Sequence, residues 1–171
     1  MILTGKEIIN RLGGDIVISP FDVEQVNPNS YNLRLGNELQ VYENETLDSK
    51  INNNTMSIEI PESGYLLEKG KLYLAKTLEY TETINLVPML NGRSSIARLG
   101  LFVHVTAGFG DIGFRGYWTL ELLPSKNILV YPNMKICQIY YVLPYGIQSI
   151  KYDGKYQDNH GIQSSKYYTE F

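Results

Sequence analysis

Residues 91–123, NGRSSIARLGLFVHVTAGFGDIGFRGYWTLELL, place charged side chains inside the most hydrophobic third of the chain. The apolar runs at 101–107 and 117–123 are short and bounded by turn residues, which is typical of buried β-strands. The glycine-rich segment between them predicts tight turns. The stretch therefore predicts β-structure, with charged groups placed where a binding or catalytic site could form.

The remainder of the chain continues this pattern of short apolar runs separated by Asn, Gly, Pro and Ser. About ten short strands with turn signals between them predict a barrel or jelly roll rather than alternating strands and helices. We therefore expect one mainly β domain, a distorted jelly-roll-like barrel with short helices, spanning residues 1–171. Besides the two runs above, strands are expected in 30–42, 55–61, 64–80 (two strands joined by a Glu-Lys-Gly turn), 86–90, 127–132 and 135–145.

Two short helices interrupt the strand pattern. Residues 4–12 begin with Thr4 and Glu7, which fit a capping box, and two glycines follow Leu12 as expected at a helix end. Residues 94–100 predict a single helical turn, capped by Ser94 or Ser95 and closed by Gly100.

Composition narrows the class of protein. A chain of 171 residues that is 43% hydrophobic is long enough for one domain with its own core. The net charge of −3 argues against a nucleic-acid polymer as partner, although local arginines still permit a small anionic ligand. The single cysteine, Cys137, cannot form an internal disulfide, which favours a reducing compartment. The N-terminus does not resemble a signal peptide and no apolar run approaches a membrane span, so we expect a cytoplasmic protein.

Glu121 is the acidic residue within the apolar run 117–123. Strand alternation places Glu121 and Thr119 on the face opposite Leu120 and Leu122. This face is either exposed to solvent, as on many antiparallel strands, or lines a cleft in which a carboxylate performs acid–base chemistry.

Arg93 and Arg98 flank two serines on one short turn. Each arginine alone is an ordinary surface residue, but together with the hydroxyls and helix N-terminal amides they form a good cradle for phosphate oxygens. Asp111 is either a plain turn residue or a carboxylate that binds a sugar hydroxyl.

The two histidines do not indicate a metal site. His104 lies in an apolar run, where a lone histidine is more often a core or interface residue, and His160 is expected to be solvated. The zinc-dependent deaminases use an HxE and PCxxC pattern, which this chain lacks, and structural zinc is equally unsupported. We therefore expect no protein-held metal.

Three segments together resemble the dCTP deaminase family of the trimeric dUTPase-like superfamily. The central segment 92–122, GRSSIARLGLFVHVTAGFGDIGFRGYWTLEL, carries most of the resemblance. PNSYNLRLG (28–36) is similar to a strand near the family's N-terminus, and YDGKYQDNHG (152–161) is similar to its nucleotide-closing tail.

The resemblance implies a homotrimer with active sites between subunits, and zinc-independent hydrolysis of dCTP to dUTP and ammonia. It implies that Glu121 is the general base, that Ser94 and Arg98 support the water, and that the Ala107 carbonyl holds it. Arg93 with the Ser94–Ser95 turn is expected to grip the triphosphate, which carries Mg²⁺, and Asp111 the 3′-hydroxyl. The complete set of residues implied to bind substrate is Arg93, Ser94, Ser95, Ile96, Ala97, Arg98, Asp111, Thr119, Leu120, Glu121, Gln138, Tyr152, Lys155 and Asn159.

Several alternatives remain open at this point. Some relatives continue to dUMP and diphosphate, so a bifunctional deaminase–diphosphatase is the main alternative. A dUTPase alone is disfavoured because the tail lacks that enzyme's glycine-rich arginine motif, and a non-catalytic nucleotide-sensing barrel is a further alternative. The chain departs from many relatives at Asn91, Ile112 and Asn159. The family also suggests inhibition by dTTP, and residues 152–171 are expected to form a mobile lid rather than a frayed terminus.

Overall fold

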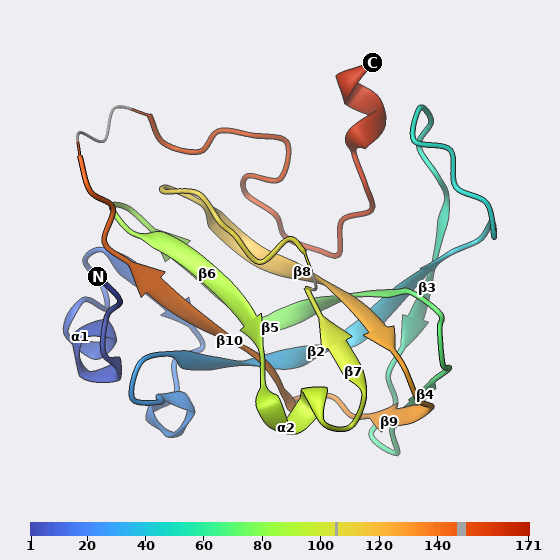
Figure 1. The fold of residues 1–171 in the computed structure, drawn as a ribbon, viewed down its shortest axis with the longest axis horizontal. Coiled ribbons are helices and arrows are strands. Elements are labelled where there is room, and N and C mark those ends of the chain that lie inside the picture. Colours follow the sequence, from blue (N-terminus) through green and yellow to red (C-terminus); the bar gives the residue numbers. More distant parts are fainter. Residues whose placement is uncertain (105, 147–149) are drawn as a thin grey trace.

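The computed structural model describes residues 1–104, 106–146 and 150–171 of the 171-residue chain. Within them, strands far outweigh helices and form a curved, nearly closed sheet (Figure 1). The prediction of a mainly β, barrel-like fold is confirmed. The elements are α1 (Gly5–Asn10), β1 (Ile16–Ser19), the 3-10 helix η1 (Val23–Gln25), β2 (Tyr31–Tyr42), β3 (Thr55–Glu59), β4 (Tyr65–Leu67), β5 (Tyr73–Thr83), β6 (Val87–Gly92), α2 (Ser94–Ala97), β7 (Leu101–Val103), β8 (Arg115–Pro124), β9 (Ile128–Val130), β10 (Lys135–Val142) and the 3-10 helix η2 (Tyr167–Glu170).

The main sheet joins strands that are far apart in the sequence. Its order is β6-β10-β2-β5-β8-β7, with β1 paired to β5 and β3 paired to β2. The two strands expected within 64–80 do form, as β4 and β5, but they do not pair with each other. Instead β4 pairs with β9 in a separate two-stranded sheet. Local sequence therefore predicts the strands but not their partners.

The core is built by strand alternation. On β8, Leu120 and Leu122 are fully buried, whereas Thr119 and Glu121 are half-buried on the opposite face, as the alternation predicts. An ion pair also crosses the interior, because Glu79 of β5 is fully buried and its carboxylate lies 2.6 Å from the Arg34 Nε of β2. The same carboxylate accepts a hydrogen bond from the Arg34 backbone amide.

The short helices follow the sequence prediction in part. Thr4 caps α1 by accepting a hydrogen bond from the Glu7 amide, but the Glu7 carboxylate pairs with Arg11 and does not complete the capping box. The predicted serine cap of α2 is wrong, because Arg93 occupies the N-cap position without a side-chain hydrogen bond and Ser94 is the first helical residue. Gly100 closes this turn with φ +84°, as expected.

The strand expected over 101–107 is shorter than predicted. β7 ends at Val103 because His104 has φ +48°, a left-handed conformation that an extended strand does not contain. Val105 of that predicted strand lies outside the described residues. None of the helices in the described part of the chain is long and apolar enough to span a bilayer.

The C-terminal segment (150–171) runs alongside β8 in space (Figure 1). The Tyr117 amide donates to the Asn159 carbonyl, and Gly116 forms a parallel bridge with Asn159. This path brings residues from the end of the chain beside the strand that carries Glu121.

Candidate active site

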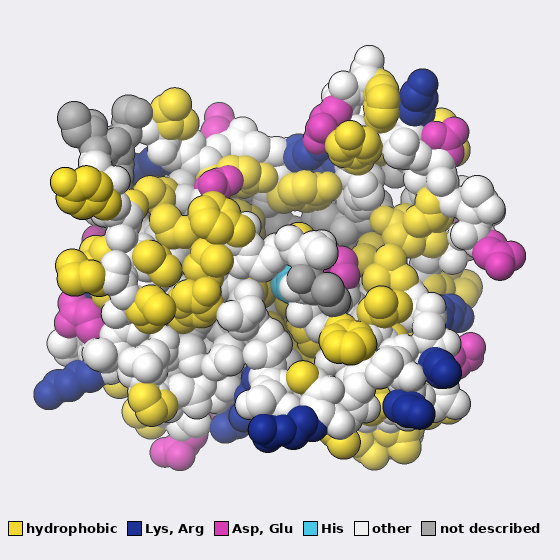
Figure 2. Space-filling view, viewed as in Figure 1, with side chains coloured by type: hydrophobic (Ala, Val, Ile, Leu, Met, Phe, Trp, Pro, Cys, Tyr) yellow, Lys and Arg dark blue, Asp and Glu magenta, His cyan; other side chains and the backbone are white. Residues whose placement is uncertain are grey.

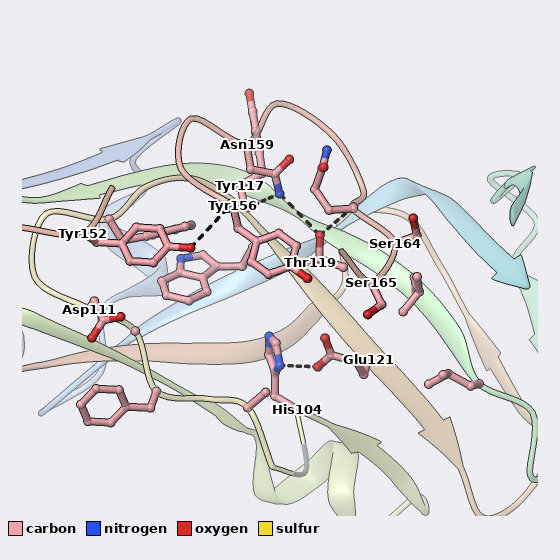
Figure 3. Close-up of a pocket in the computed structure, with 18 of the residues that line it drawn as sticks. His104, Asp111, Tyr117, Thr119, Glu121, Tyr152, Tyr156, Asn159, Ser164 and Ser165 are labelled. Carbon is pink, nitrogen blue, oxygen red and sulfur yellow. Dashed lines mark hydrogen bonds and ion pairs between the residues drawn. The ribbon is translucent and has the colours of Figure 1, made fainter. Parts of the chain in front are cut away.

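A cavity of about 470 Å³ opens between β8, the turn segment that precedes it and the C-terminal segment. Figure 2 shows the hollow on this face of the molecule, and Figure 3 shows the side chains around it. A cavity of this size fits a small-molecule ligand. Its lining residues are Tyr42, Leu72, Leu74, His104, Ala107, Phe109, Gly110, Asp111, Phe114, Tyr117, Trp118, Thr119, Glu121, Tyr152, Tyr156, Asn159, Gln163, Ser164 and Ser165.

Glu121 lies beside His104 in the lining of this cavity (Figure 3). The His104 Nδ1 atom lies 2.5 Å from the Glu121 Oε2 atom, a distance that fits an ion pair. Among the described residues, however, neither ring nitrogen makes a hydrogen bond of normal geometry. The histidine side chain is 5% exposed while that of Glu121 is 41% exposed, so the carboxylate is open to a ligand on one side and held by the imidazole on the other.

The segment before β8 forms another wall. The Phe114 amide donates to the Asp111 carbonyl, so Asp111 sits in a turn, and it also lines the cavity. Its contact with a sugar hydroxyl stays a prediction. Gly110 is buried there. A Cβ atom at Gly110 would lie 2.6 Å from the Trp118 ring, so only glycine allows the segment to pack this closely. The Phe114 ring packs against Trp118 in a tilted arrangement with 4.4 Å between ring centroids, which gives the cavity an apolar aromatic wall.

The C-terminal segment closes the remaining side through polar contacts with β8 and with the end of β2. The Asn159 Nδ2 atom donates to the Tyr117 carbonyl at 2.9 Å, and its Oδ1 accepts from the Gly161 amide. The Gln163 amide donates to the Thr119 Oγ1, and the Ser165 amide donates to the Tyr42 hydroxyl. Residues more than a hundred positions apart in the chain therefore meet at this cavity.

An ion pair fastens the same segment just outside the cavity. The Arg115 guanidinium donates two hydrogen bonds to the Asp158 carboxylate, and the Arg115 amide donates to the Gln157 side chain. The contact with Arg115 lowers the pKa of Asp158 below its usual 3.8, so this carboxylate stays charged at neutral pH. Both side chains are exposed, which makes the pair sensitive to salt.

Comparison with known proteins shows to which family the chain belongs. A family model described as dCTP deaminase-like matches residues 2–142. A protein named "dCTP deaminase, dUMP-forming" from Clostridium botulinum (strain Eklund 17B / Type B) is 61% identical over the whole of this chain and 99% of its own length. Proteins of the same name from Clostridium beijerinckii and Cytophaga hutchinsonii are each 60% identical over the same shares.

The chain belongs to the dCTP deaminase family.

One solved structure supports the fold of this dCTP deaminase family member. The 2′-deoxycytidine 5′-triphosphate deaminase from Agrobacterium tumefaciens superposes with a TM-score of 0.66 at 21% sequence identity. The superposition covers 86% of this chain but 49% of that chain, so the present chain spans about half of its length. At this identity the likeness concerns the fold alone.

Six of the predicted family residues meet at the cavity, namely Ala107, Asp111, Thr119, Glu121, Tyr152 and Asn159. Asn159 lines it, but its amide is already bonded to β8 and to Gly161, so it holds the C-terminal segment in place. Leu120 is predicted to bind substrate, yet its side chain is fully buried in the core. Its side chain therefore cannot make the expected contact, and its backbone lies opposite Ala75 of β5.

The predicted phosphate-binding residues lie elsewhere on this chain. Those of α2 and the turn before it, from Arg93 to Arg98, do not appear among the described residues that line the cavity, and neither does Gln138. The Arg93 guanidinium donates to the Lys135 carbonyl, which ties this turn to β10. Ile96 is buried, so its side chain cannot serve the substrate-binding role expected of it.

Lys155 also lies apart from the cavity lining. Its ammonium contacts the Glu170 carboxylate of η2 and lies 5.9 Å from the Tyr156 ring centroid. The contact with Glu170 raises the pKa of Lys155. Binding of the substrate by Lys155 therefore stays a prediction.

His104 is one residue of the candidate site that sequence reasoning missed. A lone histidine in an apolar run fits a core position, and the sequence contains no sign of its left-handed backbone. The wall residues Tyr156, Gln163 and Ser165 were missed as well, because they come from a polar segment without strand or helix periodicity. Among the described residues, no group of three or more His, Cys, Asp or Glu side chains is placed to hold a metal ion.

Proposed function

We propose that this protein hydrolyses dCTP to dUMP, ammonia and diphosphate. The observation that carries the proposal is the likeness of about 60% identity, over the whole chain, to relatives named dCTP deaminase, dUMP-forming. This likeness favours the bifunctional alternative over the main sequence-based expectation, in which dUTP was the released product. The cavity supports the first half of the reaction, because it contains a carboxylate beside aromatic walls of suitable size.

Glu121 is the general base in this proposal. It takes a proton from a water molecule whose oxygen attacks C4 of the cytosine ring, and it gives that proton to N3. It then takes the remaining proton from the new C4 hydroxyl and gives it to the amino group, which leaves as ammonia while the C4 carbonyl of uracil forms. One carboxylate can perform these transfers in sequence when its position is fixed and one side remains open. Glu121 meets both conditions, because His104 contacts it at 2.5 Å while the carboxylate is partly exposed to the cavity.

The cavity walls suit a pyrimidine deoxynucleoside. Trp118, Phe114 and Tyr117 offer aromatic surface for the base and sugar, and Asp111 offers a carboxylate for a sugar hydroxyl. The Ala107 carbonyl, which the family uses to hold the attacking water, belongs to a residue of the same wall. The second half of the reaction, in which water attacks the α-phosphorus and releases diphosphate, is inferred from the relatives' names alone.

We also propose that the active form is a homotrimer whose sites lie between subunits. Glu121 lines the cavity, but the residues proposed to bind phosphate, Arg93, Ser94 and Arg98, are not among the described residues of the same subunit that line it. A second copy that presents its α2 turn to this cavity would unite the two groups.

The apolar surface of the monomer supports this assembly. Phe109 is 66% exposed and forms a bridge with Met89 of the edge strand β6, and Ile2 is 59% exposed and forms a bridge with Val142 of β10. Figure 2 shows hydrophobic side chains gathered over one half of this face. Burial against another subunit would remove this surface from water.

The remaining expectations belong to the same proposal. Mg²⁺ binds through the triphosphate rather than through a protein cage. The product pathway leads toward dTTP, so dTTP is proposed as an inhibitor at the same site. Residues 152–171 act as a lid that opens for substrate entry, and the protein works in the cytoplasm.

The proposal is tested by incubating the purified protein with dCTP and Mg²⁺ and separating the nucleotide products by chromatography. We expect dUMP as the released nucleotide. Accumulation of dUTP would show a monofunctional deaminase, and unchanged dCTP would refute the catalytic proposal in favour of a nucleotide-binding role.

A mixing experiment tests the shared site. Glu121→Gln and Arg98→Ala each remove one half of the site, so each variant alone should be inactive. If the halves come from different subunits, then unfolding and refolding the two variants together should restore part of the activity in mixed trimers. Failure of the mixture to regain activity, with trimers present, would contradict sites built between subunits.

A further inference from the structure

Hydrogen-bonded side chains connect the PNSYN segment (28–32) to β10 and to the turn before α2. The Asn32 Nδ2 donates to the Asn27 Oδ1 at 3.2 Å, and the Asn27 Nδ2 donates to the Ser30 Oγ at 3.0 Å. The Ser30 hydroxyl donates to the Gln138 Oε1 at 2.8 Å, across 108 positions of sequence. The Gln138 Nε2 then donates to the Gly92 carbonyl at 3.2 Å.

All donors in this series of hydrogen bonds point in the same direction, from Asn32 towards Gly92, and the Gly92 carbonyl at the end of the series fixes that direction. The Gly92 carbonyl can only accept, so the nitrogen end of the Gln138 amide must face it. The oxygen end then faces Ser30, whose hydroxyl proton is free to donate because the Asn27 amide supplies the other contact of that oxygen. Aligned donors of this kind strengthen one another.

The position of β10 explains why one side chain can reach both neighbours. β10 lies between β2 and β6 in the sheet, and Gln138 pairs with Asn32 on one side and Asn91 on the other. Its amide therefore spans the strand and joins the start of β2 to the end of β6. Ser30 is 7% exposed and Asn32 is 3% exposed, so water does not readily replace these bonds.

We propose that Ser30 is a positioning residue for nucleotide binding, which acts by fixing the orientation of Gln138 and its bond to Gly92. The inference rests on the proposed function and on the family resemblance, which implies that Gln138 contacts the nucleotide and that Arg93 and the serines after it grip the triphosphate. With one amide proton donated to Gly92 and one oxygen lone pair used by Ser30, Gln138 keeps one proton and one lone pair for a ligand. Without the Ser30 hydroxyl, the oxygen end loses this constraint and the amide can rotate.

The Ser30→Ala variant tests this role through steady-state kinetics with dCTP. We expect KM to rise about tenfold while kcat changes less than about threefold, because Gln138 lies away from the proton-transfer chemistry. Thr83→Val is the matched control. Thr83 is also buried and its hydroxyl also donates one bond, to the Leu86 carbonyl, but it lies outside the chain of bonds to Gln138. This control should lose stability without a change in KM.

A double-mutant cycle with Gln138→Ala separates positioning from general destabilisation. If Ser30 acts through Gln138, adding Ser30→Ala to Gln138→Ala should change KM by less than about twofold. If Ser30→Ala instead raises KM about tenfold both in the wild type and in the Gln138→Ala variant, and the wild type is active, the role of Ser30 is overturned while the proposed function stands. Should Ser30→Ala fail to fold, Asn27→Ala breaks the chain one bond earlier and should raise KM about threefold. A wild type that does not convert dCTP would instead refute the proposed function, and the role of Ser30 with it.

Discussion

The imidazole of His104 and the carboxylate of Glu121 lie 2.5 Å apart at the Nδ1 and Oε2 atoms, although they come from different elements. Glu121 is fixed by the register of β8, whereas His104 follows β7 in a left-handed backbone conformation with φ +48°. A non-glycine residue in this conformation is uncommon, and such residues gather at functional sites. The pair thus locates the position at which we expect proton transfer.

Replacing Glu121 by Gln keeps the shape of the side chain but removes the atom that accepts the proton. We expect kcat for dCTP deamination to fall at least about a hundredfold while dCTP still binds. Glu59→Gln, an exposed change on β3, serves as the control and should leave kcat unchanged. A Glu121→Gln enzyme with near wild-type turnover would show that another group is the base.

His104 is tested by two substitutions of equal size. Asn and Asp both tolerate the left-handed conformation, but Asn can donate to Glu121 whereas Asp repels it. We expect kcat/KM of His104→Asp to be at least about tenfold below that of His104→Asn. Equal values for the two variants would mean that the contact with Glu121 does not position the base.

The sequence predicts the β-rich fold and much of the site, since strand alternation places Thr119 and Glu121 on one face. It does not predict the pairing of β4 with β9, because residues more than sixty positions apart form that sheet. The pattern of an isolated strand contains no information about such a distant partner.

For the tail, too, the sequence predicts only part of what the structure shows. Family resemblance points to Tyr152, Lys155 and Asn159 as nucleotide contacts, but the Asn159 amide is bonded to Tyr117 and the Lys155 ammonium to Glu170. These bonds depend on how the tail folds back onto β8. Neither a polar composition nor the spacing of tyrosines and glycines predicts that path.

Gly116 allows the tail to dock against β8. Its φ is +145°, and a Cβ atom there would lie 2.9 Å from the Asn159 amide nitrogen. Gly116→Ala should displace the tail, so limited proteolysis should cut the chain after residue 150 several times faster than in the wild type. Bound dCTP should also protect the tail of the variant from cleavage less than it protects the tail of the wild type. Gly161→Ala is the matched control in the tail itself, because a Cβ atom there meets open space. Identical cleavage of the two variants would contradict docking of the tail at Gly116.

The buried pair of Glu79 and Arg34 should contribute to stability rather than to catalysis. Glu79→Gln leaves the Arg34 guanidinium, whose side chain is 20% exposed, without its counter-charge. We expect a loss of about 3 kcal/mol in the free energy of unfolding, seen as a Tm lower by roughly 6–12 °C at fixed protein concentration. A Tm within about 1 °C of the wild type, as expected for the exposed control Glu59→Gln, would show that this pair adds little.

Release of dUMP is tested most directly by measuring ammonia and diphosphate together while dCTP is consumed. A dUMP-forming enzyme should release the two products in equal amounts from the earliest time points, with both rates lost together in Glu121→Gln if diphosphate release requires prior deamination. Ammonia formed without diphosphate would contradict release of dUMP and identify dUTP as the product.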